Sequence, residues 1–209
     1  MTSAKNAFLM FAILFAVGSI VSCGKSSETP LNPNSVSPLS NEEMNMLQYM
    51  REEEKLARDV YQYFYDQYGL NIFKNIRSSE QTHMDAVLNV MKQFGIPDIA
   101  HPTPGMFNHP ELQTLYNSLI AQGKTSLVEA LTVGATIEDV DIRDLGIAVS
   151  GTTNTSISSM YQKLECGSGN HLRAFSGNLN NYGASYTPQF ISPEQYQEIL
   201  NSEQAHCGQ

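Results

Sequence analysis

The sequence predicts an all-α protein built as a four-helix bundle, with a long crossover that carries a short extra helix. Two observations lead to this class. Four long segments carry apolar residues at intervals of three and four, the spacing that lines one face of a helix. Short links join these segments into two pairs, and one long connection joins the pairs, as in bundles with a single crossover.

The first two helices form the first pair. Ser40 followed by Glu43 is a capping-box pattern, which predicts a helix from there to about Tyr68, ended by Gly69. The second helix should cover about residues 71–94. Because only a few residues link the two helices, we expect them to be antiparallel neighbours.

The crossover and the second pair follow. A loop with three prolines is expected at about residues 97–108, followed by a short helix at about 110–121. The third long helix should cover about 126–148, and the fourth about 154–181. The bundle would then span residues 40–183. A C-terminal tail, 184–209, should contain a short helix after Pro193.

The N-terminus has the pattern of a bacterial lipoprotein signal. Lys5 precedes an apolar run at residues 7–21, and the string IVSC then ends with Cys23. This predicts a lipoprotein signal peptide at 1–22, a lipid on the Cys23 thiol and a flexible tether at 23–39. The protein would be anchored to a membrane of the cell envelope through that lipid. An ordinary secretory signal cut elsewhere and an uncleaved anchor are the alternatives.

Composition limits the function further. The chain has 209 residues, enough for one domain of about 150 residues plus tails. Its net charge of −9 disfavours binding to nucleic acid, whose phosphates it would repel. The other two cysteines, Cys166 and Cys207, could pair in an oxidising compartment or remain separate thiols.

Polar residues interrupt each apolar stripe near its middle. On a helix, residues three or four apart share a face, so these polar side chains should point into the core. In chain order they are Glu54, Glu80 and His83, Glu138 and Asp141, and Ser168 and His171. Buried carboxylates without a counter-charge are costly. A bound cation is the simplest remedy, and the Glu-x-x-His unit of the second helix offers an oxygen and a nitrogen ligand together.

The first helix leaves its ligand open. At most one or two of the three consecutive glutamates, residues 52–54, are expected to face inward. Glu54 shares its stripe with Ala57 and Tyr61, which favours it. Glu53 lies in a neighbouring stripe and remains a rival ligand.

The third and fourth helices also leave alternatives. Asp141 could bind a metal itself or orient a ligating histidine. His171 could be a ligand or a core histidine that bonds to a protein group. Asp139 and Asp144 are expected to face water. The alternative for Glu138 and Asp141 is a plain acidic helix surface without a metal.

Four sequence blocks, spread over about residues 40–200, resemble the DUF2202 family, a domain of unknown function placed in the ferritin-like superfamily. The blocks are residues 49–61, 79–87, 133–138 and 169–175. The first block is also similar to the first helix of rubrerythrins, where the ligand Glu is followed by Ala at +3 and Tyr at +7, as are Glu54, Ala57 and Tyr61 here.

The resemblance implies a ferritin-like bundle with a carboxylate-bridged di-iron or di-manganese site. The implied ligands are Glu54, Glu80 as a bridge, His83, Glu138 and His171. One position departs from the superfamily pattern, because Ser168 stands where a second Glu-x-x-His unit would have its glutamate. Either Asp141 replaces that carboxylate, or the site is mononuclear or asymmetric.

Two functions follow as hypotheses. One is a lipid-anchored metalloprotein that uses one or two iron or manganese ions for redox chemistry on Fe(II), peroxide or O₂; zinc would limit it to a structural or hydrolytic role. The other is a non-catalytic bundle of the cell envelope with a structural or vestigial metal site. The sequence does not indicate an oligomeric state.

Overall fold

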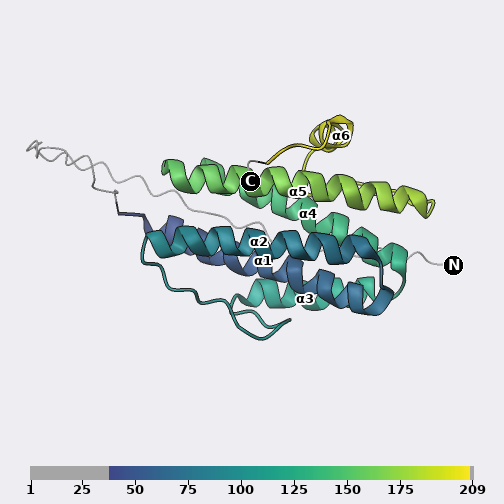
Figure 1. Cartoon of the computed structure of the whole chain (residues 1–209), viewed down its shortest axis with the longest axis horizontal. Helices are drawn as coiled ribbons and strands as arrows, with labels where there is room; N and C mark the ends of the chain where they lie inside the picture. Colours follow the sequence, from purple (N-terminus) through teal and green to yellow (C-terminus); the bar gives the residue numbers. More distant parts are fainter. Residues whose placement is uncertain (1–37, 208–209) are drawn as a thin grey trace, which may run out of the picture. The chain divides into compact units, whose positions relative to one another are not determined.

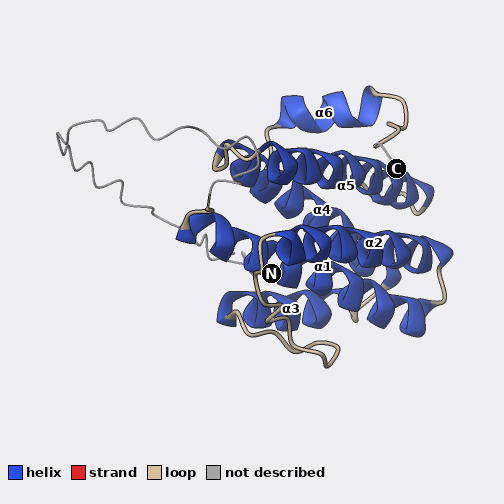
Figure 2. Ribbon diagram, turned by 60° about the vertical axis from the view of Figure 1, so that its left-hand side comes forward, coloured by secondary structure: helices blue, strands red, loops and turns tan. Residues whose placement is uncertain are grey.

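The computed structural model describes residues 38–207. The predicted signal peptide, Cys23 and nearly all of the tether lie outside the described residues. The elements are α1 (Asn41–Tyr68), α2 (Asn71–Gln93), α3 (Pro110–Gly123), α4 (Leu127–Ser150), α5 (Thr155–Asn181) and α6 (Pro193–Asn201). Within this part of the chain every element is a helix and no strand is present, which confirms the all-α class (Figures 1 and 2).

Local signals set the ends of the helices. At α1 the Ser40 hydroxyl accepts from the Glu43 N–H, and the Glu43 carboxylate accepts from the Ser40 N–H, which is the predicted capping box. Gly69 ends α1 in the left-handed conformation, with φ of 66°. Side chains of Ser126 and Asn154 cap α4 and α5. The boundaries of the long helices agree with the predicted ones to within about two residues.

The long helices pack as two pairs. α1 packs most extensively against α2, and α4 against α5; α2 also contacts α5, and α1 contacts α4 (Figure 1). The short helix α3, which belongs to the crossover, lies against α1 and α4. α6 packs on α5 (Figure 2). The four long helices therefore form a bundle, with α3 and α6 added outside it.

A polar layer divides the core of this bundle into two apolar clusters. The larger cluster contains Tyr61, Phe64, Phe73 and Phe175 together with residues of the first half of α4. The smaller one is built from the first half of α1, the second half of α2 and the facing ends of α4 and α5. The buried polar residues between them are those at which the apolar stripes were interrupted: Glu54, Glu80, His83, Glu138, Asp141, Ser168 and His171.

All three consecutive glutamates of α1, residues 52–54, are buried, although Glu52 lies on the outer side of the helix and not toward the core. The reason is that the crossover loop covers the outer side of α1. Glu52 is fully buried there, and its carboxylate accepts hydrogen bonds from the backbone N–H groups of His101, Asn108 and His109.

Lys55 and Asp59 hold the same loop. The Lys55 ammonium donates to the Asp59 carboxylate at 2.7 Å and to the backbone carbonyls of Thr103 and Met106. Asp59 in turn accepts from the Gly105 N–H at 2.9 Å. Two side chains one helix turn apart thus provide hydrogen-bond partners for backbone groups of a loop that has no secondary structure of its own.

Asp139 fixes the segment that follows α5. It is fully buried rather than facing water, and its carboxylate accepts from the Tyr186 hydroxyl and from the backbone N–H groups of Gln189, Phe190 and Ile191. The expectation that Asp139 faces water is therefore wrong. This carboxylate thereby holds residues 186–191 of the tail against α4.

The C-terminal tail returns to α5. Cys166 of α5 and Cys207 are joined by a disulfide, the pairing that the sequence left open. The Asn170 side chain bonds to the Ala205 backbone, and Arg173 donates to the Ile199 carbonyl. The tail is thus bound along one side of α5.

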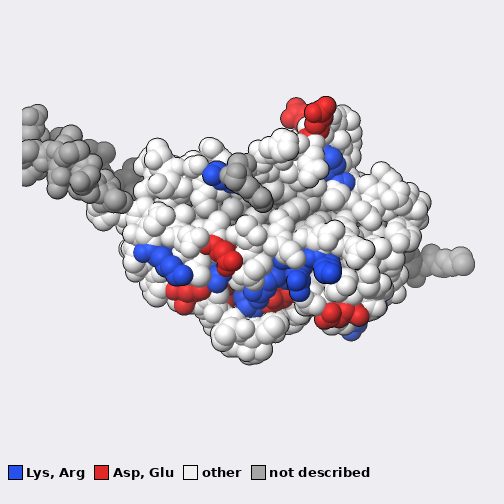
Figure 3. Space-filling model, viewed as in Figure 1, with Lys and Arg blue, Asp and Glu red and all other residues white. Residues whose placement is uncertain are grey.

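Charges on the surface are partly paired. Figure 3 shows lysine and arginine side chains gathered over the α1–α2 half of one face, beside acidic ones. Arg51 pairs with Asp98 at 3.0 Å, and Arg58 pairs with Asp59 at 2.7 Å. Among the described helices, none combines the length and the apolar character that crossing a bilayer requires.

Candidate metal centre

The five predicted ligands meet in the polar layer. Glu54 comes from the middle of α1, Glu80 and His83 from α2, Glu138 from α4 and His171 from α5. Each of the five is at most 8% exposed. Because Glu80 and His83 are three residues apart on one helix, both side chains reach the layer from the same face of α2.

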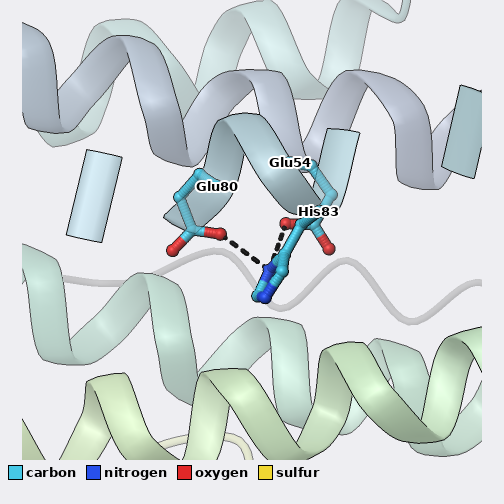
Figure 4. Close-up of side chains that lie close together, drawn as sticks. All are labelled: Glu54, Glu80 and His83. Atoms are coloured by element: carbon cyan, nitrogen blue, oxygen red, sulfur yellow. Dashed lines mark hydrogen bonds and ion pairs between the residues drawn. The ribbon is translucent and has the colours of Figure 1, made fainter. Parts of the chain in front are cut away.

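The first group consists of Glu54, Glu80 and His83 (Figure 4). The Nδ1 atom of His83 lies 2.9 Å from Oε2 of Glu80 and 3.2 Å from Oε2 of Glu54. Figure 4 shows the two carboxylates directed at the imidazole ring from different sides. One ligand atom from each residue lies within 4.8 Å of the others, so the three could hold one cation.

The second group consists of Glu80, Glu138 and His171. The Nδ1 atom of His171 lies 2.9 Å from Oε1 of Glu80 and 3.3 Å from Oε2 of Glu138. Glu80 therefore belongs to both groups and turns one oxygen toward each imidazole. This arrangement suits two cations that share the Glu80 carboxylate.

Several atoms of the centre are close together without forming hydrogen bonds. Oε1 of Glu80 and Nδ1 of His171 are only 2.9 Å apart, yet neither atom has a hydrogen-bond partner. Oε1 of Glu54 is buried without a partner as well. Unpartnered buried polar atoms are rare because each one costs free energy. A cation between these atoms would satisfy them together.

Neighbouring residues hold the ligands in place. The Tyr61 hydroxyl donates to Oε1 of Glu138 at 2.5 Å, which leaves Oε2 for the second group. Nε2 of His171 lies 3.0 Å from the Ser79 hydroxyl, so Nδ1 is the free nitrogen. The rings of His83 and His171 stack with centroids 5.5 Å apart.

Gly167 makes room for the His83 ring. A Cβ atom at position 167 would lie 2.6 Å from Nε2 of His83, closer than carbon and nitrogen can approach without a shift. Glycine is unfavourable in a helix interior. Here its lack of a side chain lets α5 pass close to the imidazole.

Asp141 and Ser168 form a pair beside the two groups. The Ser168 hydroxyl lies 2.5 Å from Oδ2 of Asp141, while Oδ1 of Asp141 is buried without a partner. Asp141 belongs to neither of the two metal-ligand groups. The structure thus puts a carboxylate from α4 next to Ser168 of α5.

Burial and neighbouring charges together shift the pKa values of the ionisable groups in the centre. Burial raises the pKa of Glu54 to about 7, although His83 acts in the opposite direction. Burial and the neighbouring carboxylates also raise the pKa of Asp141. Burial lowers the pKa of His171, but Glu80 and Glu138 outweigh it and raise the value to about 10. Without a metal, the imidazoles therefore hold protons that a cation would displace.

The structure decides between the two candidate ligands of α1. Glu54, not Glu53, is in the centre; both Glu53 oxygens are buried outside the two groups. The contact between Ser79 and His171 was not predicted. Ser79 lies outside the apolar stripe of its helix, so nothing in the sequence indicates this contact.

Fold and centre together define a class: a helical bundle with a buried acid–imidazole cluster that could hold a metal. The comparisons with known proteins give the family. The chain belongs to the family described as "Uncharacterized protein domain (DUF2202)", whose sequence model matches residues 43–203. This confirms the family to which the four sequence blocks point.

The chain is similar to a relative in sequence and to a crystal structure in fold. The chain is 52% identical over 166 residues to "Uncharacterized protein MJ0754" of Methanocaldococcus jannaschii, an alignment that covers 79% of this chain and 90% of the relative. A crystal structure of hypothetical protein MJ0754 from Methanococcus jannaschii matches with a TM-score of 0.79 at 49% identity, covering 86% of this chain and all of the other.

Replacing Gly167 by alanine should disturb the centre without unfolding the bundle. The added methyl group would push the His83 ring away from Glu54 and Glu80, so we expect weaker binding of a divalent cation, by about tenfold or more. Gly169→Ala is the matched control, because nothing lies within 4 Å of a Cβ atom there. Calorimetric titration with Mn(II) measures the difference; equal affinities in both variants would contradict the contact.

The metal-free protein should lose stability as the pH rises. The unfolded chain releases the Glu54 proton near pH 4.5, whereas the folded protein keeps it to about pH 7, so the free energy of unfolding falls across that window. This group accounts for about 3 kcal/mol. His171 adds a second fall between about pH 6.5 and 10, because its raised pKa stabilises the protonated folded form.

Urea unfolding at pH 5, 7 and 9 tests this pH dependence. With a chelator present, the midpoint should decrease at each step. With saturating Mn(II) the decrease should largely disappear, since the cation takes the place of the protons. A chelated protein whose midpoint stays level from pH 5 to 7 would show that Glu54 ionises normally.

Proposed function

We propose that this protein binds two divalent metal ions, iron or manganese, in its central polar layer and uses them for redox chemistry on a small substrate. The observation that carries the proposal is the position of Glu80, which turns one oxygen toward each of two imidazoles and so links two ligand groups. The ferritin-like superfamily, which the sequence blocks resemble, has dinuclear sites of this composition and supports the same reading.

The donor set limits the metal. Three carboxylates and two imidazoles suit iron, manganese and zinc, whereas no thiolate is among these ligands to select a softer metal. Iron or manganese ions change their charge by one electron reversibly. Bound in the centre, they could pass electrons from Fe(II) to peroxide or O₂. Zinc would leave only a structural or hydrolytic role.

The protein residues around the centre would orient the ligands and limit access. Tyr61 holds one oxygen of Glu138, and Ser79 holds the outer nitrogen of His171. His83 and His171 are the most exposed of the five ligands, at 8% each. This limited exposure suits a small substrate such as O₂, peroxide or a metal ion better than an organic molecule.

We also propose a lipid anchor at Cys23, supported by the apolar run and the string IVSC that precede the tether. Expressed in a bacterium with its native leader, the protein should fractionate with membranes, and Cys23→Ser should release it to the soluble fraction. A wild-type protein that is soluble without detergent would contradict the anchor.

Metal analysis of anaerobically purified protein tests the centre. We expect about two ions of iron or manganese per chain, in line with the two ligand groups. Glu80→Ala should lose both ions, because both groups share this carboxylate, and His83→Ala should lose at least one. Asp85→Asn removes an exposed carboxylate from the same helix and should keep the wild-type content.

The same variants separate redox chemistry from a structural role. Peroxide should oxidise Fe(II) faster with the wild type than with buffer or Glu80→Ala, and protein loaded with Zn(II) should be inactive. A non-catalytic bundle would oxidise Fe(II) no faster than Glu80→Ala does, and a bundle with an empty polar layer would also show equal stability with and without Fe(II) or Mn(II). That result would replace the redox proposal with the structural alternative.

A further inference from the structure

A hollow between α1, α2 and the crossover loop is lined by two arginines and belongs to no site described so far. Its volume is about 510 Å³, within the range of about 300–1,000 Å³ that is typical of small-molecule sites. The lining residues are Arg58, Asp59, Gln62, Arg77, Ser78, Gln81 and Pro104. None of the five candidate metal ligands is among them. The proposed redox function therefore leaves this hollow unexplained.

Positive charges outnumber negative ones around the hollow. Among the described residues that line it, Asp59 is the one acid. One oxygen of Asp59 accepts from the Lys55 ammonium at 2.7 Å, and the other accepts from the Arg58 guanidinium at 2.7 Å. Three cations, from Lys55, Arg58 and Arg77, thus surround one carboxylate and leave an excess of two positive charges. Figure 3 shows the lysine and arginine side chains gathered over this half of one face, although the whole chain carries a charge of −9.

Two glutamines hold the guanidinium groups in place. Nη1 of Arg58 donates to Oε1 of Gln81 at 2.8 Å, and Nη1 of Arg77 donates to Oε1 of Gln62. The amide group of each glutamine in turn donates to an aspartate four residues further along its own helix. These two aspartates therefore bind the glutamines and do not line the hollow. Side chains fixed in this way lose less conformational freedom when a ligand binds.

Most donors of Arg77 have no partner in the protein. A guanidinium carries five N–H donors. Within the described part of the chain, Arg77 makes one hydrogen bond, to Gln62, and no ion pair, which leaves four donors for a ligand. Asp59 and Gln81 take three donors of Arg58, so two remain there. Guanidinium donors are arranged as a fork that matches two oxygens of a phosphate group.

We propose that this hollow binds a phosphate group, either as inorganic phosphate or as a small soluble phosphate monoester. A monoester carries about −1.5 to −2 charge at pH 7, which matches the excess of two positive charges. The free donors of Arg77 and Arg58 would bind its oxygens. A phosphate diester such as a lipid headgroup carries a single negative charge and would leave one cation uncompensated. The site goes beyond the proposed function and does not depend on the metal centre.

Calorimetric titration of the full chain with inorganic phosphate at pH 8 and low ionic strength tests the site. We expect one phosphate to bind per chain, and Arg77→Gln to weaken this binding by about tenfold or more. Arg77 is partly exposed, so this variant should fold normally, which its melting temperature checks. Lys163→Gln is the matched control, because it removes one positive charge from an exposed position on α5 and should bind as the wild type does.

Two further titrations fix the kind of ligand and the place where it binds. Dimethyl phosphate, a diester with one negative charge, should bind at least about tenfold more weakly than phosphate. Equal or tighter binding of the diester would assign the hollow to a lipid headgroup and overturn the monoester. Glu80→Ala, which should empty the metal centre, is expected to bind phosphate like the wild type. Loss of phosphate binding in Glu80→Ala would place the anion on the metal and overturn the site.

The remaining outcomes separate this site from the proposed function. A wild type without saturable phosphate binding, or equal affinities in Arg77→Gln and Lys163→Gln, would overturn the phosphate site and leave the metal centre as proposed. A protein that retains no metal but binds phosphate through Arg77 would overturn the redox function and support the phosphate site.

Discussion

The burial of several ionisable side chains in one layer is the constraint on which the rest of this structure depends. Glu54, Glu80, Glu138, His83 and His171 separate two apolar clusters that would otherwise form one continuous core. Such a layer weakens a bundle unless opposite charges meet within it. The imidazole–carboxylate contacts of 2.9–3.3 Å provide part of this compensation, and a cation would complete it.

The same constraint explains the charged run on α1. Successive residues of a helix point about 100° apart, so each charged residue of the run meets a different surrounding. Glu52 binds the backbone of the crossover loop, Glu53 faces α4, Glu54 enters the centre, and Lys55 holds the loop again. Asp139 performs the corresponding task for the tail. The loop and the tail thereby cover the outer sides of α1 and α4.

Residues whose role depends on their own helix could be predicted from the sequence. Glu80 and His83 share a stripe with core residues, so their inward direction follows from helical spacing alone. Glu52 and Asp139 could not be predicted, because their burial depends on distant segments that fold over them. Spacing gives the face of a helix on which a residue lies, but not what covers that face. The contact between Gly167 and His83 is likewise a property of two helices together.

Ser168 is the position at which the chain differs from the ferritin-like pattern that its sequence blocks resemble. Where that pattern has a glutamate on the fourth helix, this chain has a hydroxyl that bonds to Asp141 of α4. On this side of the layer the carboxylate therefore comes from α4, and the Ser168 hydroxyl of α5 bonds to it. Four carboxylates, from Glu54, Glu80, Glu138 and Asp141, then surround the centre and would balance two divalent ions with both imidazoles neutral. A single ion would leave two of these carboxylates to be neutralised by protons, as the raised pKa values of Glu54 and Asp141 allow, and a second ion would take the place of those protons.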